Sequence, residues 1–376
     1  MTLAPFVPDS PRFVSRRTGC VRRFVERDIP QVARVHRAAF RLGDSPALAA
    51  YHDYFTRVFL ENPAGDGPLP SLVYQESDGR IAGFVGIVPR RVAINGHHFQ
   101  AVVSSQFIVD PASHVALVAL RLAKAYLEGP QDLSIADEAN DVSRKIWEGL
   151  GGTTALLFSI YWTRPLRPAR LAMSYLRQRR GFAPLAAAAS PLATVADTVA
   201  TQLPGSHFRQ SEPSASAGDL CGQAVLAHAP EFCGTTSLRV EYDDRTFQWL
   251  LDRAANRSAG GRLLKAILRN EQKILGWYIC HLDRDGVADV AQLSATSSSI
   301  HDVLDHLFYQ AWRQGAVAVT GRLEPRFMQA LSDKYCLFHR RGPWVLIKAN
   351  KPELLQSFQS GDTCFSRFDG EWSLRL

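Results

Sequence analysis

The sequence lacks the features that mark several large classes of protein. Its 376 residues contain no uninterrupted apolar segment of 18, so we expect no transmembrane helix. The first 17 residues hold no apolar signal-peptide core, and the six cysteines form neither a C-x-x-C motif nor a paired Cys/His spacing. These absences indicate reduced thiols, no structural zinc and a cytoplasmic location. The motifs G-x-S-x-G, G-x-x-x-x-G-K-[ST] and H-E-x-x-H are also absent, which disfavours α/β hydrolases, P-loop nucleotidases and zinc peptidases.

The composition is that of a globular protein with room for two cores. Hydrophobic residues make up 46% of the chain and charged residues 21%. The formal net charge of +7 comes from 43 basic and 36 acidic residues, so an anionic partner is compatible with the composition. However, no basic run is interleaved with aromatic residues, and we therefore expect no specific nucleic-acid partner. Nothing in the sequence specifies an oligomeric state.

The N-terminal part alternates between the two-residue period of strands and the 3.6-residue period of helices. Turn residues at 76–79 and 95–96 indicate an antiparallel meander, and each later apolar helix is closed by glycine. This pattern predicts an α+β fold with crossover helices. The predicted strands cover 21–25, 71–75, 81–89, 99–109, 132–136 and 155–162, and the predicted helices 29–40, 45–59, 115–127 and 140–150.

The C-terminal part repeats this order, which predicts two related domains. The hairpin strand that opens Ile81-Ala82-Gly83-Phe84 has a counterpart in Ile274-Leu275-Gly276-Trp277. We therefore predict domains at residues 18–165 and 221–376, with a mostly antiparallel mixed sheet in each. The strand predicted at 344–349 completes the second domain, and the aromatic tail at 358–376 is expected to dock on the body.

Residues 166–220 are predicted to connect the two domains. The stretch begins with a series of arginines, which precede a charge-free, alanine-rich segment at 181–196. One interpretation is an interdomain helix packed on both units. The alternative is a peripheral contact, in which the basic and apolar parts rest on an anionic membrane surface.

Two stretches of the first domain carry a family resemblance. The first is the strand, loop and helix that run from Phe107 to Ala119, and the second is the series Asn140, Ser143, Trp147 and Gly151 along one helix. This order and spacing resembles the GCN5-related N-acetyltransferase (GNAT) superfamily, in which backbone amides after the strand hold the coenzyme A pyrophosphate. The resemblance implies that acetyl-CoA or another acyl-CoA binds at Ile108, Val109, His114, Val115, Ala116, Leu117, Val118, Asn140, Ser143 and Trp147.

The sequence departs from the family pattern at two of these places. Residues 110–119 contain no glycine, although glycine would allow close approach of the backbone to a phosphate, and β-branched Val115 and Val118 stand there instead. Trp147 occupies the position of a family tyrosine that protonates the departing thiolate, a role that an indole N–H does not fill. These departures are typical of a relative that has lost catalysis.

An acyl transfer to an amine also requires a base near the acceptor. Asp137 and Glu138, at the end of a predicted inner strand, are the candidate bases, and Gln106 is a candidate for positioning a water or the substrate. His301, Asp302, Asp305 and His306 share i, i+4 spacings on one predicted helix, which we interpret as exposed ion pairs rather than a metal site.

The leading hypothesis is therefore an acyl-CoA-dependent N-acyltransferase that acts on a small-molecule amine by direct attack on the thioester. In this hypothesis the first domain binds the cofactor and the second shapes the acceptor site. Two alternatives remain. One is a non-catalytic binding or scaffold protein with the same fold. The other is an aminoacyl transferase similar to the FemAB group, although the second half has no helical-arm insertion of that kind.

Overall fold

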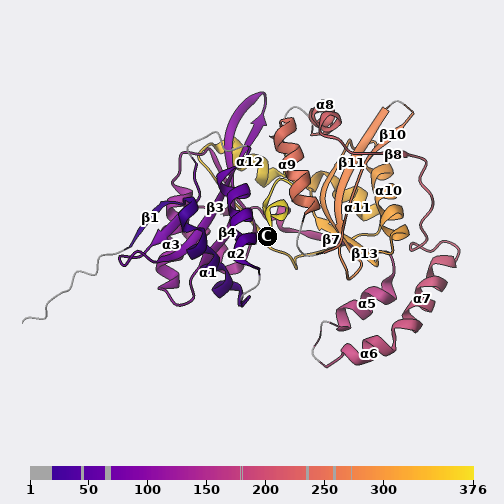
Figure 1. Cartoon of the computed structure of the whole chain (residues 1–376). Coiled ribbons are helices and arrows are strands. Elements are labelled where there is room, and N and C mark those ends of the chain that lie inside the picture. The colour runs from indigo at the N-terminus through magenta and orange to yellow at the C-terminus, as the bar shows by residue number, and fades with distance from the viewer. Residues whose placement is uncertain are drawn as a thin grey trace, which may run out of the picture.

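A computed structural model gives the arrangement of the chain (Figure 1). It describes residues 19–43, 46–63, 69–177, 179, 181–233, 237–256, 260–271 and 273–376. Two β-sheets lie side by side, each covered by helices, and a group of helices projects from beneath the second sheet. The first domain was predicted to begin at residue 18 and the second helix at residue 45, and both positions lie outside the described residues.

The first sheet is mixed and mostly antiparallel. Its order is β1–β2–β3–β4–β5–β15–β6, with β9 beside β3 and β16 beside β9. Only the pairs β4–β5 and β16–β9 are parallel. The strands are β1 (Cys20–Arg23), β2 (Leu72–Gln75), β3 (Ile81–Ile94), β4 (His97–Val109), β5 (Leu133–Ala139), β6 (Thr153–Thr154), β9 (Leu238–Glu241), β15 (Trp344–Ala349) and β16 (Thr363–Cys364).

Helices cover both faces of this sheet because its strands alternate between two apolar faces. Phe84 and Val88 of β3 pack in the cluster of α1 and α2, whereas Val85 and Ile87 pack in the cluster of α3 and α4. The helices are η1 (Glu26–Asp28), α1 (Ile29–Phe40), α2 (Leu48–Phe55), the π-helical η2 (Thr56–Leu60), α3 (Val115–Leu127), α4 (Asp141–Gly149) and η3 (Leu157–Ser159).

The second sheet has the order β14–β7–β13–β12–β11–β10–β8, in which only β12 and β13 are parallel. Its strands are β7 (Tyr161–Pro165), β8 (Ser216–Gly218), β10 (Arg262–Asn270), β11 (Lys273–Leu282), β12 (Val287–Ala295), β13 (Ala318–Arg322) and β14 (Leu337–His339). The helices in the C-terminal half of the chain are α8 (Gly222–Cys233), α9 (Asp244–Ala255), α10 (Ile300–Arg313), η4 (Pro325–Phe327), α11 (Met328–Asp333), α12 (Pro352–Ser360) and η5 (Glu371–Leu374). The predicted α+β class with two mixed, mostly antiparallel sheets is confirmed.

The sequence repeat has a structural counterpart at its glycines. The order β2–β3–β4–α3–β5 recurs as β10–β11–β12–α10–β13. A Cβ on Gly83 would lie 2.7 Å from a methyl of Val118 on α3, and one on Gly276 would lie 3.0 Å from a methyl of Val303 on α10. In both halves, therefore, the glycine of the central strand lets the crossover helix pack directly on the sheet.

The two halves exchange a strand, which corrects the predicted linear domains. β7, from the N-terminal half, pairs with β13 of the second sheet, whereas β15, from the C-terminal half, pairs with β5 of the first. The strand at 344–349 therefore does not complete the second domain as predicted, and the boundaries at 165 and 221 do not separate the sheets. An apolar alternation identifies a strand and its buried face but does not determine which sheet it joins.

The connecting region forms a helical arm made of α5 (Pro168–Arg177), α6 (Ala183–Ala188) and α7 (Ser190–Gln202). Its buried contact with the body is that of Leu171 with Val317 and Ala318 of the second half. In Figure 1 the arm projects away from the first sheet. The structure therefore differs from the interpretation of a helix packed on both units, because the buried apolar contact of the arm is with the second half only.

The C-terminal segment docks between the sheets, as its aromatic residues predicted. Phe368 and Trp372 are fully buried in a cluster that also contains Phe84 of the first half and Trp277 of the second. Phe368 also donates its N–H to the carbonyl of Ala291 on β12 (3.0 Å). The chain therefore ends near the middle of the molecule, beside the first sheet (Figure 1).

Candidate functional site

The candidate site begins where two parallel strands separate. β4 and β5 pair over Ala101–Val103 and Leu133–Ile135, and the pairing ends there. Beyond this point β4 contains a bulge, because Gln106 and Phe107 together oppose Val85 of β3, and Gln106 has a positive φ of 54°. A bulge bends and twists its strand, so the rest of β4 diverges from β5 and opens a gap in the sheet.

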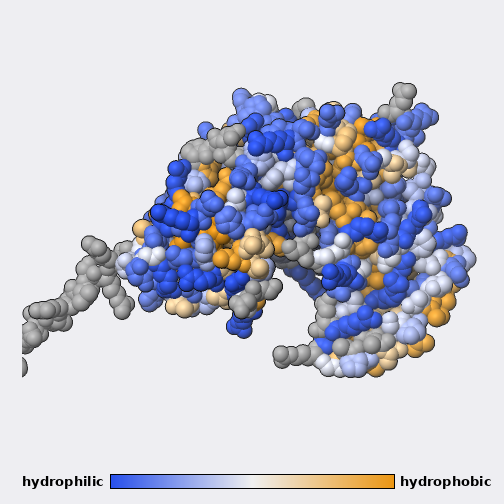
Figure 2. Space-filling view, viewed as in Figure 1, coloured by the Kyte–Doolittle hydropathy of each residue, from blue (hydrophilic) through white to orange (hydrophobic). Residues whose placement is uncertain are grey.

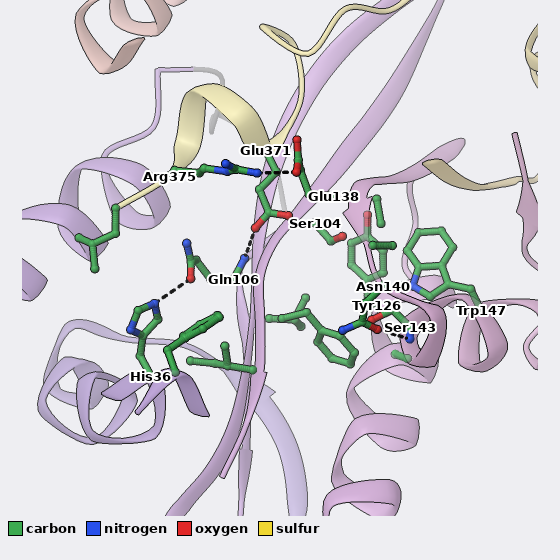
Figure 3. A pocket seen from close by; sticks show the side chains of 18 of the residues that line it. His36, Ser104, Gln106, Tyr126, Glu138, Asn140, Ser143, Trp147, Glu371 and Arg375 are labelled. Atoms are coloured by element: carbon green, nitrogen blue, oxygen red, sulfur yellow. Dashed lines mark hydrogen bonds and ion pairs between the residues drawn. The ribbon is translucent and has the colours of Figure 1, made fainter. Parts of the chain in front are cut away.

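A cavity of about 820 Å³ occupies this gap (Figure 3). Its walls come from β4 and β5, from helices α1, α3 and α4, and from the C-terminal segment. Most of the lining is apolar, with side chains such as Phe40, Phe107, Ile108, Ala136 and Trp147, and a few polar groups stand among them. A concave, largely apolar site with few polar groups is typical of a small-molecule pocket.

The start of α4 forms one polar edge of the cavity. Asn140 is the N-cap, and its side chain accepts the N–H of Ser143 (2.9 Å). Trp147, one turn further on, is buried against Tyr126 with ring centroids 5.6 Å apart. Tyr126 in turn donates its hydroxyl at 3.1 Å to carbonyls of both diverging strands, Val102 and Ile135. Asn140, Ser143 and Trp147, which were predicted to lie along one helix, thus all line the cavity. Asn140 and Trp147 also stabilise that helix.

Glu371 is a cavity residue that no pattern in the sequence indicates. It lies on η5, and its Oε1 accepts the backbone N–H of Gln106 (2.9 Å) and the hydroxyl of Ser105 (3.2 Å). Desolvation and the nearby carboxylates Asp137 and Glu138 raise the pKa of Glu371 to about 8. A carboxyl with this pKa exchanges a proton near neutral pH, which is the property required of a general base.

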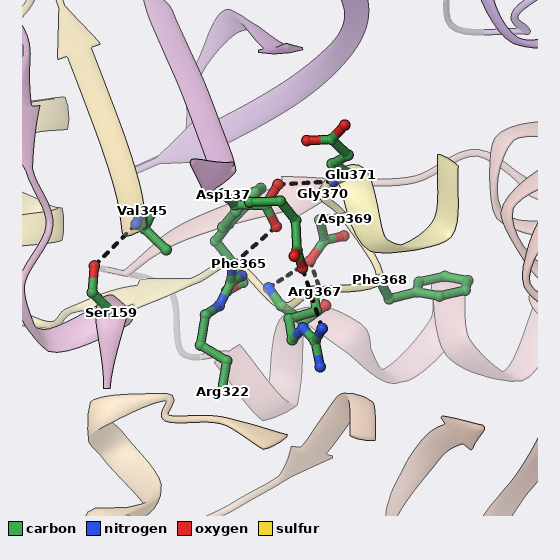
Figure 4. Close-up of polar contacts among 12 residues, drawn as sticks. Asp137, Ser159, Arg322, Val345, Phe365, Arg367, Phe368, Asp369, Gly370 and Glu371 are labelled. Carbon is green, nitrogen blue, oxygen red and sulfur yellow. Dashed lines mark hydrogen bonds and ion pairs between the residues drawn. The ribbon is translucent and has the colours of Figure 1, made fainter. Parts of the chain in front are cut away.

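The two predicted bases occupy different environments because successive strand residues face opposite sides. Glu138 lines the cavity and pairs with Arg375 (2.5 Å) and Arg367 (3.2 Å). Asp137 does not line it: its side chain is fully buried and pairs with Arg322 of β13 at 2.9 Å. Asp137 also accepts the backbone N–H of Glu371 at 2.8 Å (Figure 4).

The contacts of Asp137 indicate a structural role. The ion pair joins β5 of one half to β13 of the other, and its second oxygen holds the segment that carries Glu371. A Cβ on Gly370 would lie 1.9 Å from that carboxylate, so only glycine fits beside it. Asp137 therefore fixes the place of the cavity carboxyl, and its own side chain does not reach the cavity.

Gln106, predicted to position a substrate, does line the cavity, and α1 supplies a partner that the sequence analysis missed. His36 is buried and contacts Gln106 Oε1 through Nε2 (3.1 Å) and the Tyr51 hydroxyl through Nδ1 (2.8 Å). Because Gln106 Oε1 accepts, Nε2 carries the proton and Nδ1 accepts from Tyr51. Burial lowers the pKa of His36, which favours this neutral form. The 3.6-residue period of α1 predicted the buried face of the helix but not the contact between His36 and Gln106.

The predicted phosphate-binding residues divide into two groups. Ile108 lines the cavity, whereas Val109 and the residues from His114 to Val118 do not. Val115, Ala116 and Leu117 are exposed in the first turn of α3, where the amides of the last two have no intrahelical acceptor. Val118, expected to crowd a phosphate, is instead buried against Gly83. The first turn of α3 therefore presents amides to solvent without obstruction by Val118.

The His/Asp series on α10 was interpreted as exposed ion pairs, and the structure places the ion pairs of His301 and Asp305 with residues outside this helix. His301 lies 3.7 Å from Asp333, Asp305 pairs with Lys334 at 2.5 Å, and buried His306 contacts the hydroxyl of Tyr278 at 3.2 Å. Among the described residues no group of three or more His, Cys, Asp or Glu side chains is placed to hold a metal ion. In the same part of the chain, no helix has the length and apolar character needed to cross a membrane.

Comparison with known proteins identifies the fold. No family model and no curated protein matches the sequence. Among solved structures, a probable N-acyltransferase from Enterococcus faecalis V583 aligns over 91% of this chain and 74% of its own, with a TM-score of 0.57 and 12% identity. A GCN5-related N-acetyltransferase from Anabaena variabilis aligns over 88% and 72%, with a TM-score of 0.56 and 12% identity.

A third similar structure is Saccharomyces cerevisiae N-myristoyltransferase, solved with bound myristoyl-CoA and inhibitors. It aligns over 91% of this chain and 82% of its own, with a TM-score of 0.50 and 9% identity. At such identities the similarity concerns the fold. The chain thus has the fold of the GCN5-related N-acetyltransferases, which is the fold that the resemblance implied, and this fold contains two sheets that exchange the strands β7 and β15.

Proposed function

We propose that the protein is an acyl-CoA-dependent N-acyltransferase whose reaction takes place in the cavity between β4 and β5. The observation that carries this proposal is the position of Glu371, a carboxyl with a pKa of about 8 in the wall of an apolar cavity. Acetyl-transferring and myristoyl-transferring proteins are among the structures of similar fold, which supports acyl transfer in general. The acyl chain and the amine acceptor are parts of the proposal.

The residues present fit a thioester of coenzyme A. The apolar side chains of Phe107, Ile108 and Trp147 suit an acyl chain and the pantetheine arm, and the hydroxyl of Ser143 suits a polar group of that arm. The exposed amides in the first turn of α3 suit the pyrophosphate, since the N-terminal end of a helix favours an anion. Bound thioester would supply the activated acyl group.

The proposed reaction is a direct transfer. The acceptor nitrogen attacks the thioester carbonyl, and Glu371 takes a proton from that nitrogen as the C–N bond forms. The tetrahedral intermediate then collapses with cleavage of the C–S bond. The sulfur leaves as a thiolate, which departs as an anion or regains a proton from Glu371. The products are the N-acyl amine and free coenzyme A.

A non-catalytic acyl-CoA-binding protein is the second candidate, and two observations favour it. Residues 110–119 lack glycine, and buried Trp147 stands where the family has a tyrosine acid. Such a protein would share the cavity and its affinity for the thioester. It would release no coenzyme A with any acceptor, and this readout separates the two candidates.

The first test measures binding by isothermal titration with acetyl-CoA and with a longer acyl-CoA. The Ser143→Trp variant places an indole in the cavity and should lower the affinity for both at least tenfold. The matched control is Val142→Trp, because Val142 precedes it on α4, does not line the cavity and is 66% exposed. Affinity that is lost in both variants, or in neither, would contradict the proposed site.

The second part of the test is an acceptor screen. Primary amines are incubated with the protein and the thioester that binds more tightly, and free coenzyme A is measured with a thiol reagent. Release that depends on the amine and disappears in Ser143→Trp supports transfer. Binding without release from any amine supports the non-catalytic candidate.

A further inference from the structure

The helical arm has an inverted distribution of apolar residues. On α7 the side chains that face α5 are small or polar, namely Ala193 and Asp197, which are 6% and 4% exposed. The large aliphatic residues of α7 lie on the outward face at i, i+3 and i+7: Leu192 (73% exposed), Val195 (62%) and Val199 (52%). Leu203, the residue directly after the helix, is 55% exposed. An ordinary surface helix turns such residues toward the core. The outward stripe therefore marks a contact surface.

Neighbouring helices extend the apolar surface. Leu185 of α6 is 61% exposed, Phe182 before it 46%, and Tyr175 at the end of α5 53%. Figure 2 shows apolar residues along the lower right margin of the arm, and Figure 1 shows α6 and α7 as the part of the molecule furthest from the first sheet. The surface therefore belongs to a projection that could meet a planar partner without obstruction by the body.

The charges on the arm are of one sign. Residues 168–203 contain four arginines, no lysine and a single acidic residue, Asp197. Asp197 is buried and accepts the backbone N–H groups of Ala169 (2.8 Å) and Arg170 (3.0 Å), so it offers no negative charge to a partner. Arg177 and Arg179 are exposed, next to the apolar residues of α5 and α6. The exposed charges of the described part of the arm are thus all positive.

We propose that this arm docks on the surface of a lipid bilayer that contains anionic headgroups. The apolar faces of α6 and α7 would enter the boundary between headgroups and acyl chains, and the arginines would lie among the phosphates. A second copy of the chain is disfavoured as the occupant, because pairing two arms through this surface brings cations of the same sign together. This surface lies apart from the cavity, so the inference stands whether or not the protein transfers acyl groups.

The test is co-sedimentation of the whole protein with vesicles of phosphatidylcholine, alone or with phosphatidylserine added. We expect binding to the anionic vesicles that weakens as salt rises. Replacement of two stripe residues in Leu192→Gln/Val199→Gln should lower the partition coefficient about tenfold or more. The matched control Thr194→Gln/Thr198→Gln alters exposed residues of the same helix that flank the stripe and should change little.

The charge contribution is tested separately. The variant Arg177→Gln/Arg179→Gln should lower binding to anionic vesicles about fivefold per arginine and leave binding to neutral vesicles unchanged. Circular dichroism and the thermal unfolding midpoint confirm that each variant is folded. The proposal is overturned if the folded wild-type protein does not bind anionic vesicles, or if the stripe and control variants lose binding equally. It is also overturned if light scattering shows a dimer that only the stripe variant abolishes.

Discussion

Replacement of Glu371 by glutamine tests the proposed base directly. Glutamine keeps the size of the side chain, and its Oε1 can still accept from the backbone N–H of Gln106 and the hydroxyl of Ser105. The variant therefore retains the local structure but cannot take a proton. If Glu371 is the general base, kcat should fall by about 10²- to 10⁴-fold, while the affinity for acyl-CoA remains within about twofold.

The pKa of about 8 fixes how this loss depends on pH. With that value, the carboxylate fraction is about 1% at pH 6, about 9% at pH 7 and about half at pH 8. The ratio of wild-type to variant activity should therefore rise about 50-fold between pH 6 and pH 8 and level off above about pH 9. The ratio is the useful quantity because ionisation of the acceptor amine affects both proteins equally and cancels.

The assay follows free coenzyme A at saturating thioester with one amine acceptor from pH 6 to pH 9. Circular dichroism at each pH confirms that both proteins stay folded. A ratio that does not change with pH would refute the assignment of Glu371 as the base. So would a variant that retains activity within about twofold of the wild type at pH 8.

Three further predictions concern Gly370, the first turn of α3 and the stability of the protein as a function of pH. In Gly370→Ala the new Cβ would lie 1.9 Å from the carboxylate of the buried ion pair between the sheets. The free energy of unfolding, measured with denaturant, should therefore fall by about 3 kcal/mol. The control is Gly149→Ala, whose Cβ meets no atom within 4 Å and which should not destabilise the protein. Val115→Asp should weaken acyl-CoA about fivefold in titration by repelling the pyrophosphate, whereas Leu120→Asp, similarly exposed but further along α3, should not. The pKa of the Glu371 carboxyl is higher in the folded state than its ordinary value of 4.5. Between pH 4.5 and 8 the folded state therefore holds more protons than the unfolded state, and stability falls as pH rises. The thermal midpoint of the wild type, measured relative to that of Glu371→Gln, should decline across this window, and a constant difference would contradict the raised pKa.

The elements of the first domain could be predicted because local patterns determine them. The change from a two-residue to a 3.6-residue period after Asp110-Pro111 gave the strand and the helix on either side of the loop, and the observed α3 has the predicted bounds. The spacing of Asn140, Ser143 and Trp147 likewise placed these three residues on one helix, and all three line the cavity. Spacing along a single helix is a local property, so it survives whatever the helix packs against.

The choice of base was only partly predictable. The sequence identified Asp137 and Glu138 as the acidic end of an inner strand, but their alternation alone did not show which one faces the cavity. The structure turns Glu138 toward it and buries Asp137 against Arg322, 185 residues away. Glu371 carried no signal at all, because it stands in a short aromatic tail and meets Gln106 across 265 residues.

The sequence by itself therefore determined the element order, the repeated hairpin and the helix that lines the cavity, since each depends on neighbours a few residues apart. Only the tertiary structure decided the exchange of β7 and β15 between the sheets, the divergence of β4 from β5, and the position of the Glu371 side-chain carboxyl in the gap. These features depend on pairing and burial between segments far apart in the chain. Such contacts leave no periodic pattern in either segment, because each strand alternates in the same way whichever sheet it joins.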